Sequence, residues 1–201
     1  MQLRPYQTKY INNFKVGTSN LLRAECRSGK SLILENIVDK YFTNKQVLII
    51  SNRIEVLNEL SNYFPNSTRL QGSHKYDSSK LVTLATPQTL IRRDTDYSIY
   101  DCIAIDEIHE VRSMKAVKLL RESYTGTFIG MTATPLKADG SFIGGFENIL
   151  DYTSVPYMIK NGYLCPTKFY SAGDLTESAN LSIKRGEYVE SEVEQAMNKQ
   201  G

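Results

Sequence analysis

The sequence predicts an α/β fold, with a mostly parallel, doubly wound sheet flanked by helices. Two observations carry this prediction. Short apolar runs rich in β-branched residues recur along the chain, and continuous runs of this kind are typical of strands buried on both faces, as in parallel sheets. Segments whose apolar residues have helical spacing separate several of these runs. Strands that alternate with helices favour a parallel sheet covered on both of its faces.

The expected elements can be assigned along the chain in order. The strands are Leu21–Leu22, Val47–Ile50, Leu81–Leu84, Cys102–Ile105 and Thr127–Gly130. Helical spacing is found at Leu32, Ile33, Ile37 and Tyr41, at Ile54, Leu57, Leu60 and Phe64, and at Val117, Leu119, Leu120 and Tyr124. The glycine-containing stretch Leu136–Asn148 is expected to be a mobile loop. A weak helix is expected over residues 190–199.

The composition is that of a folded domain. Of 201 residues, 41% are hydrophobic and 23% are charged, which excludes an intrinsically disordered chain. The length suits one domain with a real core. No apolar run approaches the roughly 20 residues of a membrane span, and the first ten residues lack an apolar signal-peptide core. We therefore expect a cytoplasmic protein without a membrane partner.

Cysteine and histidine usage argues against a disulfide framework or a zinc site. Cys26, Cys102 and Cys165 are odd in number, far apart and form no CxxC pair. The chain has only two histidines, His74 and His109. A reduced compartment fits this pattern best.

Charge is unevenly distributed along the chain. Residues 1–80 carry 12 Lys and Arg against 6 Asp and Glu, although the net charge of the whole chain is only +2. This imbalance is compatible with a polyanionic partner, and equally with ordinary charge segregation on a soluble surface.

The segment Ala24–Ser31 (AECRSGKS) lies between a predicted strand and a predicted helix, which is the context that a phosphate-binding loop requires. Backbone N–H groups and the helix N-terminus would face the phosphates. Gly29 would let the backbone approach closely, Lys30 would reach the β- and γ-phosphates, and Ser31 would hold Mg²⁺. The alternative is a chance GKS at a strand–helix turn, since Ala24 stands where the general pattern has Gly.

Asp106 and Glu107 follow a predicted strand directly. Ligands of open α/β sheets bind at this end of the strands, and two adjacent carboxylates are costly without a cation. Asp106 would hold Mg²⁺, and Glu107 would orient and deprotonate the attacking water. The alternative is a strand end that opens a helix, whose first turn favours acidic residues.

The segment Gly130–Pro135 (GMTATP) ends the last strand of the alternation. Its small residues would lie beneath the acidic pair, and the hydroxyls of Thr132 and Thr134 could bond both the acidic strand and a neighbouring domain. A polar exit from the strand is the plainer alternative.

These elements, in this order, resemble the motifs of superfamily 2 helicases. Residues 24–31 resemble motif I (Walker A), Asp106–His109 a DExH form of motif II, and Thr132–Thr134 motif III. Further segments extend the resemblance over nearly the whole chain: Leu3–Gln7 is similar to the Q motif, Ile50–Arg53 with Glu55 to motif Ia, and Ala85–Thr89 to motif Ib. Tyr157–Pro166 looks like the segment that closes the first motor domain in the RadD and XPB-like branch, which includes the Res III subunits of restriction enzymes.

The resemblance implies a single RecA-like P-loop domain that binds ATP with Mg²⁺ and acts on DNA, as a single strand or a branched duplex, with RNA as the alternative. Glu107, Asp106 and Lys30 would be catalytic, and Ser31 and Asp106 would hold the metal. Nucleotide contacts would come from Arg4, Gln7, Arg27, Ser28, Gly29, Lys30 and Ser31. Motif III and His109, through Thr132 and Thr134, would couple hydrolysis to strand separation. Asn52, Arg53, Thr86 and Gln88 would lie on the strand-binding face.

Two segments depart from the family pattern. Cys26-Arg27 replaces the usual Thr-Gly. Arg27 would strain the loop if that position needs a positive φ, or would add a phosphate contact. Asn52-Arg53 replaces Pro-Thr in motif Ia, and both residues can still contact phosphates.

Nothing after Pro166 resembles a second RecA-like domain, which supplies the arginine finger in this superfamily. We expect residues 1–170 to form the ATP-binding domain and residues 171–201 to extend toward a missing second motor domain, in a fragment or a protein that relies on another chain. The chain alone would be a weak or inactive ATP hydrolase. Three alternatives are a catalytically weak nucleic-acid-binding module, the motor part of a restriction-type nuclease, and an unrelated P-loop ATPase or GTPase.

Overall fold

A computed structural model describes residues 2–74, 76–111, 115–136, 140–166, 183–184 and 187–188. The chain divides into two compact units, Met1–Leu164 and Cys165–Gly201. The predicted domain boundary at residues 170 and 171 falls outside the described residues and stays a prediction, as does the helix expected over residues 190–199.

The first unit alternates helices and strands along the chain. Its elements are α1 (Pro5–Asn12), β1 (Ser19–Arg23), α2 (Lys30–Tyr41), β2 (Val47–Ile50), α3 (Ile54–Tyr63), β3 (Ser67–Leu70), β4 (Val82–Ala85), α4 (Pro87–Arg92), β5 (Cys102–Ile105), α5 (Ile108–Val111), α6 (Lys115–Ser123), β6 (Thr127–Thr132), β7 (Asn148–Asp151) and α7 (Val155–Lys160). In the second unit, β8 (Ile183–Lys184) and β9 (Glu187–Tyr188) form an antiparallel pair.

The seven strands of the first unit form one sheet in the order β3-β4-β2-β5-β6-β1-β7. Every neighbouring pair in this sheet is parallel. The carboxyl ends of β4, β2, β5, β6 and β1 therefore lie side by side along one edge. The segments that follow these five strands are the ones that carry the predicted motifs.

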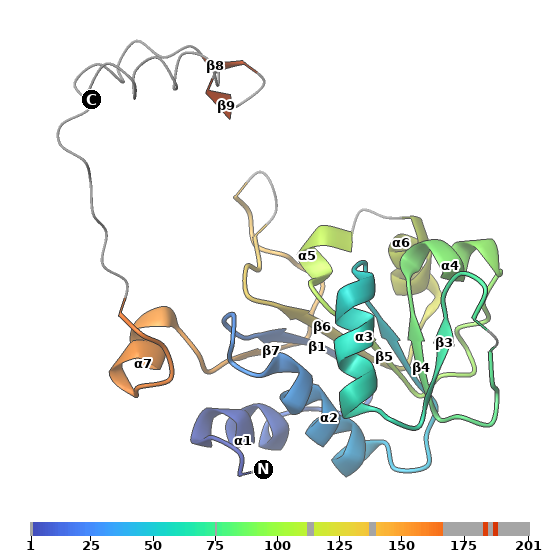
Figure 1. The fold of residues 1–201 in the computed structure, drawn as a ribbon, viewed down its shortest axis with the longest axis horizontal. Coiled ribbons are helices and arrows are strands. Elements are labelled where there is room, and N and C mark those ends of the chain that lie inside the picture. Colours follow the sequence, from blue (N-terminus) through green and yellow to red (C-terminus); the bar gives the residue numbers. More distant parts are fainter. Residues whose placement is uncertain are drawn as a thin grey trace. The chain divides into compact units, whose positions relative to one another are not determined.

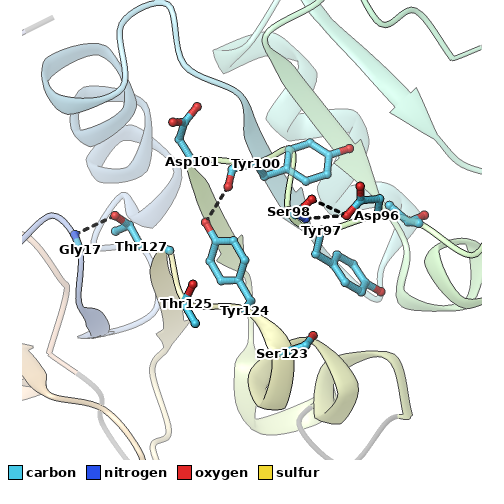
Figure 2. A pocket seen from close by; sticks show the side chains of 12 residues that line it. Gly17, Asp96, Tyr97, Ser98, Tyr100, Asp101, Ser123, Tyr124, Thr125 and Thr127 are labelled. Atoms are coloured by element: carbon cyan, nitrogen blue, oxygen red, sulfur yellow. Dashed lines mark hydrogen bonds between the residues drawn. The ribbon is translucent and has the colours of Figure 1, made fainter.

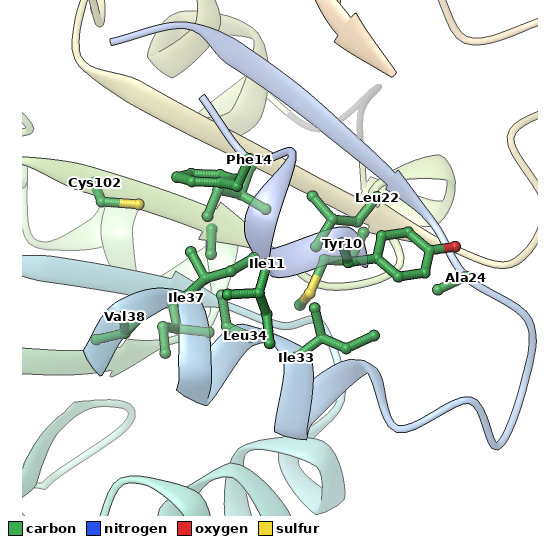
Figure 3. Packing of buried hydrophobic residues seen from close by; sticks show 14 of the residues in the cluster. Tyr10, Ile11, Phe14, Leu22, Ala24, Ile33, Leu34, Ile37, Val38 and Cys102 are labelled. Atoms are coloured by element: carbon green, nitrogen blue, oxygen red, sulfur yellow. The ribbon is translucent and has the colours of Figure 1, made fainter. Parts of the chain in front are cut away.

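Helices cover both faces of the sheet (Figure 1). Apolar residues of α1, α2, α3 and α7 belong to one buried core, and those of α4, α5 and α6 belong to the other. Side chains of β2 alternate between them: Val47 and Ile49 face the first core, whereas Leu48 and Ile50 face the second. Figure 3 shows Ile33 and Ile37 of α2 in the first core, packed with residues of α1. The predicted doubly wound α/β architecture is confirmed.

The predicted strands are present, with small differences at their ends. The strand expected at residues 81–84 lies at 82–85, and those at residues 21–22 and 127–130 extend to 19–23 and 127–132. Two strands, β3 and β7, were not predicted, and each forms one edge of the sheet. The stretch expected as a loop pairs Leu136 with Phe142 and contributes the first residue of β7, Asn148. No helix in the described part of the chain is long and apolar enough to cross a membrane.

Candidate active site

The loop between β1 and α2 has the backbone of a close-approach turn. Gly29 precedes the helix with φ 81° and ψ 46°, in the left-handed region that glycine adopts without a steric penalty. A Cβ atom at this position would lie 2.7 Å from Gln7 Nε2. The backbone conformation is therefore the main reason for glycine here, and any side chain would also displace the Gln7 amide. The first N–H groups of the 12-residue helix α2 have no acceptor within the helix and are available to an anion.

Arg27 occupies this loop with φ 61°. The position therefore does have a positive φ, which costs a residue with a Cβ roughly 1–2 kcal/mol. The side chain is exposed. Arg27 therefore strains the loop, which is one of the two outcomes expected for the Cys26-Arg27 departure. The other, a phosphate contact from Arg27, stays a prediction.

Lys30 and Glu107 meet between the two motif-bearing loops. Lys30 Nζ donates to Glu107 Oε1 at 2.7 Å, across 77 residues of sequence. Both side chains are largely shielded, with exposed fractions of 16% and 25%. Glu107 has φ 44°, an uncommon conformation for a residue other than glycine and one that is often found at functional sites.

Asp106 lies beside this pair and is buried, with 9% of its surface exposed. The pKa of the Asp106 carboxyl is raised to about 6, chiefly by burial and also by the neighbouring Glu107, while Lys30 opposes the shift. Its backbone N–H donates to Ile50 O at 2.9 Å, which anchors the acidic pair to β2. A buried carboxylate with a raised pKa and a specific charge partner is typical of a functional site.

Two buried polar atoms of the site have unused hydrogen-bonding capacity, which suits a site for magnesium and phosphate. Ser28 Oγ and Glu107 Oε2 are both buried without a hydrogen-bond partner, and such atoms are rare in the absence of a ligand or water. In the described part of the chain, His, Cys, Asp and Glu form no cluster of three or more that could hold a metal. Mg²⁺ is usually bound through one or two protein ligands together with substrate phosphates. Asp106, buried beside Lys30 and Glu107, suits that mode, while Ser31 as the second ligand stays a prediction.

The predicted coupling residues lie next to the acidic pair. His109 Nδ1 is 2.8 Å from Thr132 Oγ1, and His109 Nε2 is 3.4 Å from Thr134 Oγ1. His109 Nδ1 is also 3.4 Å from Glu107 Oε2. That oxygen still lacks a hydrogen bond, so Thr132 is the closer partner of the imidazole. The structure thus joins the predicted motifs II and III through one histidine.

The residues expected on the strand-binding face follow β2 and β4. Gln88 Nε2 donates to Asn52 Oδ1 at 3.0 Å, and Arg53 forms an ion pair with Glu110. Thr86 differs from these three: its side chain is buried and its hydroxyl bonds Thr89 at 2.9 Å. Asn52, Arg53 and Gln88 are therefore more accessible than Thr86.

The first turn of α1 lies against the phosphate-loop candidate. Gln7 Nε2 and Tyr6 Oη each donate to Ser28 O at 2.9 Å. Arg4 Nη1 donates to Tyr6 Oη at 3.2 Å, and the Arg4 guanidinium lies 4.6 Å from the ring centre of Tyr163. Arg4 and Gln7 were predicted, whereas Tyr6 and Tyr163 were missed. Both tyrosines lie inside segments that resemble family motifs, Leu3–Gln7 and Tyr157–Pro166. Only tertiary packing brings Tyr6 to the loop and Tyr163 to Arg4.

A cavity lies at the amino-terminal ends of the strands, at the edge of the sheet opposite the candidate site (Figure 2). It measures about 580 Å³ and is lined in part by Gly17, Tyr100 and Thr127, which precede or begin strands. Its two carboxylates are already engaged: Asp96 accepts from Ser98, and Asp101 accepts from the Gln46 backbone and pairs with Lys45. This cavity contains neither the phosphate-loop candidate nor the acidic pair.

Comparison with known proteins agrees with this geometry. The family model described as "Type III restriction enzyme, res subunit" matches residues 1–137. The chain belongs to this family. The residues that the structure describes have the fold of a superfamily 2 helicase RecA-like domain.

Individual relatives of this res subunit domain are distant. "Putative helicase 22" of Sulfolobus islandicus filamentous virus (isolate Iceland/Hveragerdi) is 22% identical over a match of 199 positions, gaps included; the match covers 84% of this chain and 35% of that protein. The chain thus spans about a third of the curated relative that it matches.

Two solved structures share the fold. The Pyrococcus furiosus Hef helicase domain matches with a TM-score of 0.61 and 22% identity, covering 73% of this chain and 37% of that one. A nuclease-deletion mutant of the type ISP restriction-modification enzyme LlaGI, solved with a DNA substrate mimic, matches with a TM-score of 0.61 and 15% identity, covering 81% and 21%.

Proposed function

We propose that this res subunit domain is the ATP-binding motor domain of an ATP-dependent superfamily 2 DNA helicase or translocase. One observation carries the proposal: Lys30 of the loop before α2 meets Glu107 of the acidic pair at 2.7 Å, beside buried Asp106. Such a convergence of a lysine, two carboxylates and a helix N-terminus suits a nucleoside triphosphate with its metal. In this proposal residues 24–31 act as a Walker A loop, and Asp106–His109 act as a DExH box.

The residues divide the chemistry among themselves. Lys30 and the N–H groups at the start of α2 bind phosphate oxygens and offset charge that develops during transfer. Ser31 and Asp106 would hold Mg²⁺, which when bound neutralises phosphate charge. Glu107 orients the attacking water and accepts its proton. His109 carries the state of this site to Thr132 and Thr134.

Arg4 and Gln7 would contact the adenine base, and Arg53, Asn52 and Gln88 would contact the nucleic-acid backbone, a largely sequence-independent interaction. The LlaGI enzyme, which shares this fold, was solved with a DNA substrate mimic, and this supports DNA as the track, with RNA as the alternative. The proposal has three further parts. The chain belongs to a RadD and XPB-like sub-branch, it acts in the cytoplasm, and a second RecA-like domain supplies an arginine finger.

Two specific observations support alternatives. The bulky Arg27 side chain, at a loop position with φ 61°, favours a catalytically weak binding module in which this side chain blocks the loop. The description of the matched family favours the motor part of a restriction-type nuclease. The first alternative predicts that MgATP does not stabilise the chain, and the second requires a nuclease domain on the same or a partner chain.

Substitution of the two paired residues tests the proposed function. Lys30→Ala should weaken MgATP binding by about 10- to 100-fold, because it removes a charge-assisted phosphate contact. Glu107→Gln should retain MgATP but slow hydrolysis in the intact motor by about 10²- to 10⁴-fold, because it removes the general base. Calorimetry on this chain and a phosphate-release assay on the intact motor measure the two effects.

Lys45→Ala is the matched control, because Lys45 pairs with Asp101 at the opposite edge of the sheet. It should behave like the parent in both assays. Parental hydrolysis by Glu107→Gln would exclude Glu107 as the base. Parental affinity in Lys30→Ala would exclude the phosphate-loop assignment.

A further inference from the structure

Tyr163 makes a contact that the proposed mechanism does not use. Its ring lies under the Arg4 guanidinium, with 4.6 Å between the guanidinium carbon and the ring centre. The same ring packs edge-on against Tyr6, at 5.3 Å between centres and 65° between planes. A guanidinium at this distance is attracted by the negative face of the ring. Tyr163 therefore binds the side chain that is expected to contact the base.

Tyr6 holds the other side of Arg4 and joins it to the phosphate loop. Arg4 Nη1 donates to Tyr6 Oη at 3.2 Å, and Tyr6 Oη donates to Ser28 O at 2.9 Å. The backbone N–H of Arg4 donates to Gln7 Oε1 at 2.9 Å. Arg4 is otherwise exposed, and a free arginine side chain samples many rotamers. The two tyrosines restrict it to one orientation relative to the loop.

The position of Tyr163 is itself fixed by the end of α7. Gly162 N donates to Ile159 O at 3.0 Å, and Tyr163 N donates to Met158 O at 2.8 Å. This pair of bonds is a Schellman motif, with Gly162 at φ 70° in the left-handed position that the motif requires. Met158 is fully buried in the core. The core thus holds α7, and the motif directs the chain so that Tyr163 reaches Arg4.

We infer that Tyr163 is a positioning residue for nucleobase recognition: its ring holds the Arg4 guanidinium where that group contacts the adenine of ATP. The inference rests on the proposed function, which it deepens. Tyr163 acts through Arg4 and has no role toward the phosphates. Its contribution is therefore confined to the base-dependent part of the binding free energy.

The test uses two probes on the 201-residue chain, MgATP and magnesium tripolyphosphate, which lacks a base. Tyr163→Leu retains an apolar contact with Tyr6 but removes the ring face. It should weaken MgATP binding by about three- to tenfold, the range expected for a cation–π contact. Tripolyphosphate affinity should not change, and Tyr163→Phe should recover most of the MgATP affinity. Isothermal titration calorimetry measures both probes, and thermal unfolding verifies that each variant is folded.

A double-mutant cycle distinguishes positioning from direct contact with the base. In an Arg4→Ala background, Tyr163→Leu should have no further effect on MgATP, because the group through which it acts is gone. The matched control is Tyr97→Leu, a partly buried tyrosine at the amino edge of the sheet, which should bind both probes like the parent.

Three results would overturn the inference alone: unchanged MgATP affinity in Tyr163→Leu, an equal loss of tripolyphosphate affinity, or the same loss of MgATP affinity with and without Arg4. If the parent chain bound neither MgATP nor magnesium tripolyphosphate, the proposed function would be overturned, and the inference with it.

Discussion

Several residues of the candidate site carry an energetic cost. Arg27 and Glu107 have positive φ values without being glycine, and Asp106 keeps a carboxyl buried next to a second one. Costs of this kind persist where the surrounding structure imposes them, and they concentrate at sites that bind a ligand. Two of them lead to measurements at the scale of single residues.

Arg27→Gly should stabilise the protein by up to about 1 kcal/mol. Glycine removes the steric penalty of φ 61°, while its greater freedom in the unfolded chain offsets part of the gain. Arg27→Ala removes the same guanidinium and keeps the strain, so it should not be stabilised. Urea unfolding of the three proteins measures the difference, and equal stability of the Gly and Ala variants would show that the backbone at this position costs nothing.

Asp106→Asn should raise stability at neutral pH when magnesium and nucleotide are absent. The folded-state pKa of Asp106 is raised from 3.8 to about 6. Between these values the folded chain holds a proton that the unfolded chain has released, so the stability due to Asp106 falls as pH rises through this window. The neutral Asn avoids that loss, which amounts to at most roughly 3 kcal/mol.

Urea unfolding in EDTA at pH 4 and pH 7.5 measures the effect of Asp106→Asn. The gain should be large at pH 7.5 and nearly absent at pH 4. Asp39→Asn, on the exposed surface of α2, serves as the control and should show no comparable change between the two pH values. A gain for Asp106→Asn that is equal at both pH values would contradict the proposed cost of burying the charge.

At the scale of elements, the ends of helices and strands position the functional groups. The start of α2 presents N–H groups, the ends of β5 and β6 present carboxylates and hydroxyls, and the end of α7 presents Tyr163. Short connections without periodicity, such as residues 161–164, depend on one glycine and a few backbone hydrogen bonds for their course. The conformation of α7's end is therefore a sensitive point of the site.

Gly162→Ala should destabilise the end of α7 by about 1 kcal/mol, because an alanine at φ 70° meets its own backbone. A Cβ atom at Gly162 would meet no neighbour within 4 Å, so the cost is conformational alone. Gly144→Ala is the matched control, since its Cβ also meets nothing and its φ lies outside the positive range. Amide hydrogen exchange across residues 155–164 should increase in the Gly162 variant only. Equal exchange in both variants would exclude the Schellman motif as the constraint on Tyr163.

The degree of burial of each strand explains whether the sequence predicted it, and for the helices length also matters. The runs at β2 and β5 are buried on both faces, and continuous apolar residues revealed them. The edge strands β3 and β7 are only partly buried and carry polar residues, such as Arg69 and Asn148, so no apolar run marked them. The helices α4, α5 and α7 have four to six residues, too few for a helical period to be recognised.

At the scale of the whole molecule, the described sheet supplies one half of the two-domain arrangement that the proposed motor requires. The chain covers 35% of its curated viral relative and 37% of the Hef helicase domain. In the proposed mechanism a second RecA-like domain contributes an arginine finger, which is worth about 10³–10⁵ in rate in comparable phosphoryl-transfer systems.

The 201-residue chain should therefore bind MgATP but hydrolyse it slowly, with little stimulation by single-stranded DNA and no unwinding. Calorimetry gives the affinity, and a phosphate-release assay gives the turnover. Addition of a second RecA-like domain, on the same or a second chain, should raise turnover by at least about 10³-fold. Fast turnover by the chain alone would contradict the need for a second domain.

The sequence alone determined the fold class and the edge of the sheet at which the candidate site lies. Apolar runs that mark strands buried on both faces, and the polar or small residues that end them, are local features of the sequence. Lys30, Asp106, Glu107, His109 and Thr132 could be named for the same reason. Only the tertiary structure decided that Lys30 contacts Glu107, that His109 bonds Thr132, and that Tyr163 lies under Arg4. These contacts join residues separated by 23 to 159 positions. They depend on strand order and on the packing of α1 and α7, which no local pattern of residues encodes.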